Sequence, residues 1–201
     1  MNKKVLSTVL AGALAVTAVV GGSLAYFTDK ENKDNTFTVG NVDITLTEPN
    51  WEGNGSVDAP AAYPGEPLAK DPTVKNDGAN PCFVRIKVEG LNRLGDAGMI
   101  TYRTDDVTDK LGDGWVKGDD GYFYYNSVLE VDKTTDALFD QIVMPTGLTN
   151  GDGTTEYNVV VTAEAVQAQG AKPSWADVQA MTVKEIAAWF DTCGMNEADS
   201  E

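Results

Sequence analysis

The chain has 201 residues, with 31 Asp and Glu against 15 Lys and Arg, two Cys and no His, and its formal charge is −16. Because affinity for nucleic acid comes largely from Lys and Arg that neutralise phosphate, this balance excludes nucleic acid as a partner. The absence of His excludes a Ser-His-Asp or Cys-His nucleophile pair, and also the zinc sites that contain His. The apolar content of 42% is ordinary for a globular chain, and the length suits one domain.

The first 25 residues have the pattern of a secretory signal peptide. A pair of N-terminal lysines precedes an apolar stretch over residues 5–20, and small residues follow at Ser23 and Ala25, the positions that a signal peptidase reads. The alternative is an uncleaved membrane anchor, because the apolar stretch is about long enough to span a bilayer. We predict cleavage between Ala25 and Tyr26, which removes the two lysines and takes the formal charge to −18.

Export would carry the two cysteines, Cys82 and Cys193, out of the reducing cytosol to a place where a disulfide persists. A bridge between them would close a loop of about 110 residues and would stabilise the fold by about 4–5 kcal/mol in the chain-entropy model. The alternative is a pair of buried thiols, and the sequence does not decide between the two. A redox or metal role is not favoured, because the chain has no C-x-x-C motif.

The chain after the signal peptide has the pattern of many short strands separated by turns. The clearest alternation covers residues 82–89, where every second residue is apolar. Residues 49–72 are rich in Pro and Gly and predict a long loop or short edge pieces. The pattern predicts a mainly β fold, a jelly-roll-like antiparallel β-sandwich. Further strand patterns cover residues 37–46, 122–125, 128–131, 137–143 and 157–165.

The pattern changes to a helical period near the C-terminus. Ser174 and Thr182 each stand three positions before an acidic residue, as helix N-caps do, and Ile186 and Phe190 recur at helical spacing before Gly194. One or two short helices are therefore predicted. The domain organisation that follows is a signal peptide at 1–25, an N-terminal strand segment at 26–40, a β-sandwich domain at 41–170, and a C-terminal helical segment and tail at 171–201.

An acidic and glycine-rich stretch lies between residues 104 and 121. Its aspartates are candidate ligands for calcium, which accepts oxygen ligands in flexible geometry, although the spacing matches no EF-hand loop. The alternative, which we favour, is a solvated acidic loop, because runs of charge are usually solvent-exposed. No other cofactor is predicted. The candidate ligands are Asp105, Asp106, Asp109, Asp113, Asp119 and Asp120.

Three segments are distinctive: GGSLA at the end of the signal peptide, the YFTDKE that follows it, and NTFTVGNVDITL at residues 35–46. In these segments the chain resembles the TasA/camelysin (CalY) family of exported proteins of Gram-positive bacteria. The resemblance extends from residue 10 to residue 170 and includes nothing after residue 172. Shorter similar pieces lie at residues 64–66, 74–78, 118–126 and 161–168.

The resemblance implies a jelly-roll protein that a SipW-type signal peptidase processes and that is secreted to the extracellular matrix or cell surface. It implies subunits that assemble into biofilm fibres by donor-strand exchange, in which the freed N-terminal segment completes the sheet of the next subunit. The implied partners are a second copy of the chain and a fibre-anchoring or initiating protein. The assembly residues in the N-terminal segment are Tyr26, Phe27, Phe37 and Val39.

Two other functions stay open from the sequence. One is a monomeric cell-surface binding or adhesion module, in which residues 26–39 fold back as the chain's own first strand. The other is a camelysin-like secreted metallopeptidase, which we disfavour because the chain has no His and therefore no HExxH motif. The sequence thus predicts a structural subunit and no enzyme.

Overall fold

A computed structural model describes residues 41–91, 100–148 and 158–194. These residues belong to the second of the two units into which the chain divides, residues 40–201. The predicted cleavage site, Ala25 and Tyr26, lies outside the described residues. So does the predicted assembly strand with Phe27, Phe37 and Val39.

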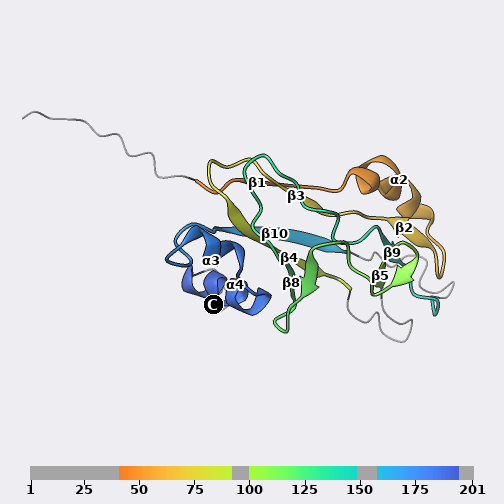
Figure 1. The fold of residues 1–201 in the computed structure, drawn as a ribbon. Helices are drawn as coiled ribbons and strands as arrows, with labels where there is room; N and C mark the ends of the chain where they lie inside the picture. The colour runs from red at the N-terminus through yellow and green to blue at the C-terminus, as the bar shows by residue number, and fades with distance from the viewer. Residues whose placement is uncertain (1–40, 92–99, 149–157, 195–201) are drawn as a thin grey trace, which may run out of the picture. The chain divides into compact units, whose positions relative to one another are not determined.

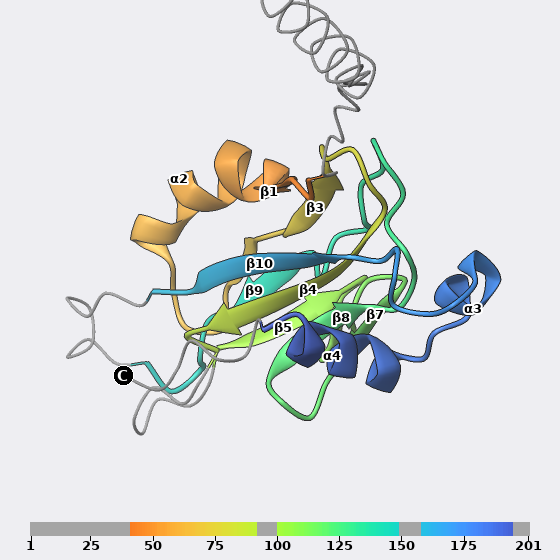
Figure 2. The same cartoon turned by 90° about the vertical axis from the view of Figure 1, so that its left-hand side faces the viewer.

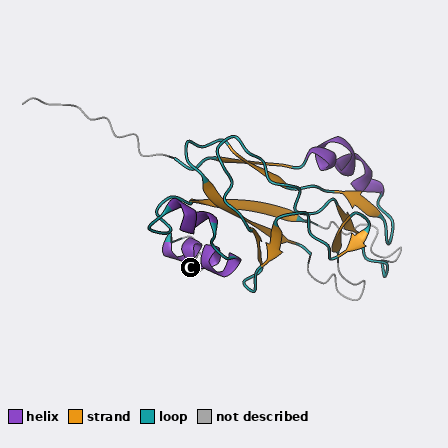
Figure 3. Ribbon diagram, viewed as in Figure 1, coloured by secondary structure: helices purple, strands orange, loops and turns teal. Residues whose placement is uncertain are grey.

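Two four-stranded antiparallel sheets form the body of this unit (Figures 1 and 3). The first has the order β10-β4-β8-β7, and the second has the order β2-β9-β5-β6. In the first sheet the strands are β10 (Val160–Gln167), β4 (Cys82–Glu89), β8 (Tyr122–Tyr125) and β7 (Trp115–Lys117). In the second they are β2 (Pro67–Ala69), β9 (Gln141–Val143), β5 (Thr101–Thr104) and β6 (Val107–Thr108).

A separate strand pair, β1 (Ile44–Thr47) with β3 (Thr73–Asn76), extends the second layer. The backbone of β3 bonds to the segment that leads into β9, because Asn76 N–H donates to the carbonyl of Lys133 and Thr135 N–H donates to the carbonyl of Val74. The segment at residues 128–131, which the sequence predicts as a strand, contributes only a single bridge, between Leu129 and Cys82.

The main core lies between the two layers. Val84 and Ile86 of β4 are fully buried there, beside Phe123 of β8 and Ile142 of β9. The alternation predicted for residues 82–89 is therefore present, with its apolar side turned to the core. The prediction of a mainly antiparallel β fold with short helices near the C-terminus is confirmed.

Two C-terminal helices, α3 (Trp175–Gln179) and α4 (Val183–Thr192), cover the other face of the first sheet (Figure 2). Both begin at the predicted caps, because the Ser174 hydroxyl accepts from Asp177 N–H and Thr182 forms a reciprocal capping box with Glu185. A second buried cluster joins the helices to the sheet. Its members are Phe83, Tyr124, Val166, Ala168, Val178, Met181, Ile186 and Phe190.

The prediction of a loop without helices at residues 49–72 is wrong for its first part, where three short helical pieces follow one another. Tertiary contacts hold them: Asp71 Oδ1 accepts from the N–H groups of Asn50 and Trp51, and the Lys70 ammonium lies 4.7 Å from the Trp51 ring centroid. Because these partners come from a distant segment, local propensity did not indicate the helices. The pieces are η1 (Trp51–Gly55), α2 (Ser56–Asp58) and η2 (Ala59–Ala61).

The capping box of α4 predicts a pH dependence of stability. The pKa of Glu185 is lowered to about 2, first by the backbone N–H of Thr182 and then by the Lys172 ammonium and the Thr182 hydroxyl. Because the pKa of Glu185 is lower in the folded chain, its ionised carboxylate stabilises the fold at pH values above its unfolded-state pKa of 4.5. This stabilisation is lost as the pH falls toward 2. We expect Glu185→Ala to lower the thermal unfolding midpoint at pH 7, with the gap to the wild-type chain narrowing as the pH falls below about 4.5 and closing only below about pH 2. Lys184→Ala, an exposed neighbour, serves as the control, and a gap that stays constant with pH would contradict the prediction.

Within the described ranges, no helix is long and apolar enough to cross a membrane.

Candidate functional site

The two sheets end in strands of very different length. Three of the four end strands are short: β7 of the first sheet has three residues, and β2 and β6 of the second sheet have three and two. The end strand β10 has eight residues, and within the described part of the chain it pairs only with β4. One row of its backbone N–H and C=O groups therefore faces away from the sheet, and a long exposed edge of this kind is a template for an added strand.

The β10 edge lies beside β1 (Figures 1 and 2), although the two strands belong to different sheets. Both strands turn apolar side chains toward the main core, and these side chains are only partly buried, in contrast to the fully buried Val84 and Ile86 of β4. We call this row the seam. It consists of Val42, Ile44 and Leu46 on the β1 side and of Val159, Val161, Ala163 and Ala165 on the β10 side.

Among the described residues, the seam is a place where apolar side chains at the border of the main core are only partly covered. A strand that enters there would gain main-chain hydrogen bonds from an edge and would bury apolar side chains, at about 25 cal/mol for each Å² of apolar surface removed from water. Successive side chains on β10 lie on opposite faces of the strand. Ala163 faces the core, whereas its neighbour Thr162 is exposed on the other face. The two faces of this one strand are therefore separately accessible to mutation.

The outer face of β10 is fixed by a charged network. Glu164 Oε2 accepts from Nε of Arg85 on the adjacent strand β4 at 2.7 Å, and the Arg85 side chain is completely buried. The guanidinium lies between two rings, 3.8 Å from the Tyr122 centroid and 4.5 Å from the Phe190 centroid of α4. The network therefore ties the edge strand to its neighbour and to the helical cover at once.

Burial and hydrogen bonding shift the pKa values of two groups in this network, Arg85 and Tyr124. Desolvation by itself would lower the pKa of Arg85, but its hydrogen bonds with Tyr124 and Glu164 outweigh that effect and raise the pKa above its ordinary value. The pKa of Tyr124 is raised to about 12 by burial and by the hydrogen bond that its hydroxyl donates to Asp120. Arg85 thus keeps its positive charge through the neutral range.

A further bond anchors the end of β10. Trp189 Nε1 of α4 donates to the carbonyl of Gln167, the last residue of the strand, at 2.9 Å. Beyond it, Ala168 N–H donates to the carbonyl of Pro81. The helical segment therefore holds the strand that carries the long edge while leaving that edge unpaired by any described strand.

The six candidate calcium ligands are not gathered into one site. Asp105 pairs with Lys110, Asp106 pairs with Arg103, and Asp120 accepts from Tyr124. Over the described ranges, no group of three Cys, Asp or Glu residues is arranged to hold a metal ion. Three of the aspartates also have positive backbone φ, at positions 105, 106 and 109, which places them in tight turns.

The two cysteines are free thiols in the structure. Cys82 is buried in the main core between the sheets, whereas Cys193 is exposed at the C-terminal cap of α4, and α4 packs on the opposite face of the first sheet. The structure therefore does not bring the two sulfur atoms together, and it buries only one of them.

This arrangement predicts different reactivities for the two thiols. Burial raises the pKa of Cys82 to about 12 and also raises that of Cys193, but only Cys193 is accessible. In the reduced chain we expect one equivalent of a thiol reagent to react in native buffer at Cys193, and a second at Cys82 only in denaturant. Peptide mapping identifies each site. A chain that takes up no reagent until it is reduced would instead show that the disulfide forms.

In the part of the chain that the structure describes, fold and site together define an antiparallel two-layer β protein with a long edge at β10 and a helical cover on the outer face of the same sheet. The family described as camelysin metallo-endopeptidase matches residues 1–91, which confirms the resemblance to the TasA/camelysin family. The chain is also 35% identical over 79 residues to a protein of Bacillus subtilis (strain 168) described as the major biofilm matrix component. That alignment covers 39% of this chain and 29% of the relative's length. No solved structure is significantly similar to the chain.

The seam is a feature that the sequence pattern only partly indicates. Residues 157–165 alternate as a strand should, and their apolar content predicted cover on both faces. The structure exposes Val160 and Thr162 on one face, and on the other face it leaves Val161, Ala163 and Ala165 partly buried beside β1, which lies more than a hundred residues earlier in the chain. Only the tertiary structure reveals that relation.

Proposed function

We propose that this protein is a secreted structural subunit of a biofilm matrix fibre. Its similarity to the major biofilm matrix component of Bacillus subtilis supports a role in the biofilm matrix. The signal-peptide pattern at residues 1–25 supports secretion. The observation that carries the proposal furthest is the long open edge of β10 beside the half-buried seam, because such an edge favours the addition of a strand.

The added strand in this proposal is the segment 26–40 of a second copy. The segment becomes the N-terminus when the signal peptide is removed, and it contains Tyr26, Phe27, Phe37 and Val39 for the apolar seam. Each subunit gives a strand at one site and accepts one at another, so the contact is heterologous and continues from copy to copy. The signal peptidase and an anchoring or initiating protein would be its other partners.

The matched family carries the description of a metallo-endopeptidase, but the donor atoms of this chain do not fit a catalytic zinc ion. The whole chain has no His, which supplies at least one ligand in the common catalytic zinc sites. Throughout the described segments, Cys, Asp and Glu form no group arranged for a metal ion. We therefore propose a structural role without peptidase activity.

Electron microscopy of two purified chains tests the proposal. One chain begins at Tyr26 and the other lacks residues 26–36, and both are concentrated at pH 4 to 7. We expect fibres from the first and monomers from the second. Fibres from the shortened chain would exclude segment 26–36 as the added strand, and monomers from both chains under all conditions would exclude the fibre function.

A further inference from the structure

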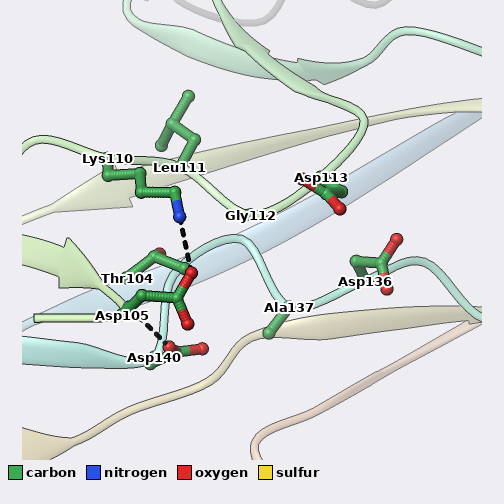
Figure 4. A pocket seen from close by; sticks show the side chains of 9 residues that line it. All are labelled: Thr104, Asp105, Lys110, Leu111, Gly112, Asp113, Asp136, Ala137 and Asp140. Atoms are coloured by element: carbon green, nitrogen blue, oxygen red, sulfur yellow. Dashed lines mark hydrogen bonds and ion pairs between the residues drawn. The ribbon is translucent and has the colours of Figure 1, made fainter. Parts of the chain in front are cut away.

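An acidic pocket lies where the β5–β6 hairpin meets the segment that leads into β9 (Figure 4). Its volume is about 200 Å³, and four carboxylates line it against a single ammonium. Two hydrogen bonds from backbone amides join the walls, since Gly112 N–H donates to the carbonyl of Leu138 and Asp105 N–H donates to the side-chain Oδ2 of Asp140. The lining side chains that carry charge are Asp105, Lys110, Asp113, Asp136 and Asp140.

The charged groups fall on two sides of the pocket. Figure 4 shows Asp105, Asp140 and Lys110 grouped at one side, with Asp113 and Asp136 at the other. The Lys110 ammonium lies 2.5 Å from Asp105 Oδ2. Its pKa is raised first by this hydrogen bond, and the charges of Asp105, Asp113 and Asp140 add to the effect. The pocket therefore already stabilises an ammonium group.

A buried hydroxyl gives independent evidence for a ligand. Thr104 lines the pocket and is only 8% exposed, yet its Oγ1 has no hydrogen-bond partner. Figure 4 shows this hydroxyl directed toward the Lys110–Asp105 pair. Leaving a buried polar group without a partner costs about 1–3 kcal/mol, so an unpartnered hydroxyl in a native pocket calls for an explanation. A donor that enters beside Asp105 would satisfy it.

The chemistry of these groups selects the ligand. Carboxylates accept hydrogen bonds only, a hydroxyl oxygen accepts as well, and an ammonium supplies three donors and no acceptor. A metal ion is less suited, because across the described residues no three acidic or Cys side chains are arranged to hold one. We propose that the acidic pocket binds an alkylammonium group, and that Lys110 occupies the place of this group in the unliganded protein.

The ammonium can come from a free polyamine or from a lysine side chain of another protein, and the two sources share this chemistry. A polyamine could reach both sides of the pocket, with one ammonium near Asp105 and Asp140 and another near Asp113 and Asp136. A single lysine side chain could reach only one side. No residue that lines the pocket belongs to the seam, and the inference does not depend on the proposed function.

Calorimetric titration of the mature chain at low salt tests the inference, with spermidine, Nα-acetyl-lysine amide, tetramethylammonium and calcium as separate probes. We expect spermidine to bind and tetramethylammonium, a monocation without any N–H donor that matches the single charge of the lysine derivative, to bind at least about tenfold more weakly. Binding of the lysine derivative at a comparable affinity would assign the source to a protein side chain, and binding of spermidine alone would assign it to a polyamine. Absence of spermidine binding, or tighter binding of calcium, would overturn the proposal.

Four variants locate the site. Asp140→Asn should weaken spermidine binding about fivefold, and Asp132→Asn, which removes the same charge outside the pocket at a position with positive φ, should leave it within about twofold. Lys110→Gln should tighten binding, because it removes the internal competitor. Thr104→Val should weaken binding without lowering the unfolding midpoint, because a hydroxyl with no partner contributes nothing to the unliganded fold. Equal effects of Asp140→Asn and Asp132→Asn would reduce the binding to general charge attraction and overturn the proposal.

Discussion

Ala163→Asp is expected to raise the concentration needed for fibre growth about a hundredfold. The Ala163 side chain faces the core from the open edge strand β10 and is only partly buried, so in the monomer a carboxylate there can still reach water. In the proposed fibre the added strand would cover it and remove its hydration. An unpaired buried charge costs several kcal/mol, and about 3 kcal/mol corresponds to a factor of a hundred. The critical concentration is measured by sedimentation of fibres at fixed pH and salt.

Thr162→Asp is the matched control for this variant. Thr162 is adjacent in sequence and exposed on the other face, so both variants add the same charge to the same strand. The control should change the critical concentration by less than about threefold, an effect of general charge repulsion. If the two variants behave alike, the seam is not the acceptor. Denaturant unfolding of each monomer separates a loss of assembly from a loss of folding.

Phe190→Ala is expected to destabilise the unit by about 3–5 kcal/mol, which is the range for a large aromatic side chain removed from a core. Phe190 is fully buried, its ring meets that of Tyr124 edge to face at 5.9 Å, and it covers the guanidinium of Arg85. Its removal leaves a cavity over a buried charge. The free energy of unfolding in urea, followed by far-UV circular dichroism, measures the effect.

Trp175→Ala provides the comparison for Phe190→Ala within the same helical cover. Trp175 begins α3 and is 37% exposed, and it is absent from the buried cluster beneath the helices. Its replacement should cost less than about 1 kcal/mol. A Phe190→Ala variant that loses no more stability than Trp175→Ala would mean that the cover is not packed on the sheet in solution.

The strand at 82–89 and the two C-terminal helix caps could be predicted from sequence because local pattern determines them. Alternation fixed the inner side of β4, and Ser174 and Thr182 accept the expected bonds from residues three positions on. The burial of Arg85 could not be predicted in this way. Period-two alternation places it on the outer side of β4, and only the packing of α4 explains why the Arg85 side chain has no access to water there.

The helical pieces at residues 51–61 also could not be predicted from local sequence pattern. Two Gly and a Pro within them argue against a helix locally. Gly55 is nevertheless required, because a Cβ there would lie 2.1 Å from the carbonyl oxygen of Ala69. The close contact with β2, together with the cap from Asp71, decides the conformation. For the candidate site, strand β10 could be predicted from its pattern, but its open edge could not, because edge position is a property of the whole sheet.

The contrast between the long and short edges has a geometric consequence. Edges β6 and β7 offer two and three residues, and Asp105, Asp106 and Asp109 surround the first of them, so a second strand would find few bonds and repelling charge there. Because β10 has the longest edge among the described strands, the proposed subunits would join end to end through it. The product would be an unbranched thread with two unlike tips, one carrying a vacant seam and the other a free N-terminal segment. It would lengthen without widening into a sheet, and a copy with a blocked seam would stop growth at one tip alone.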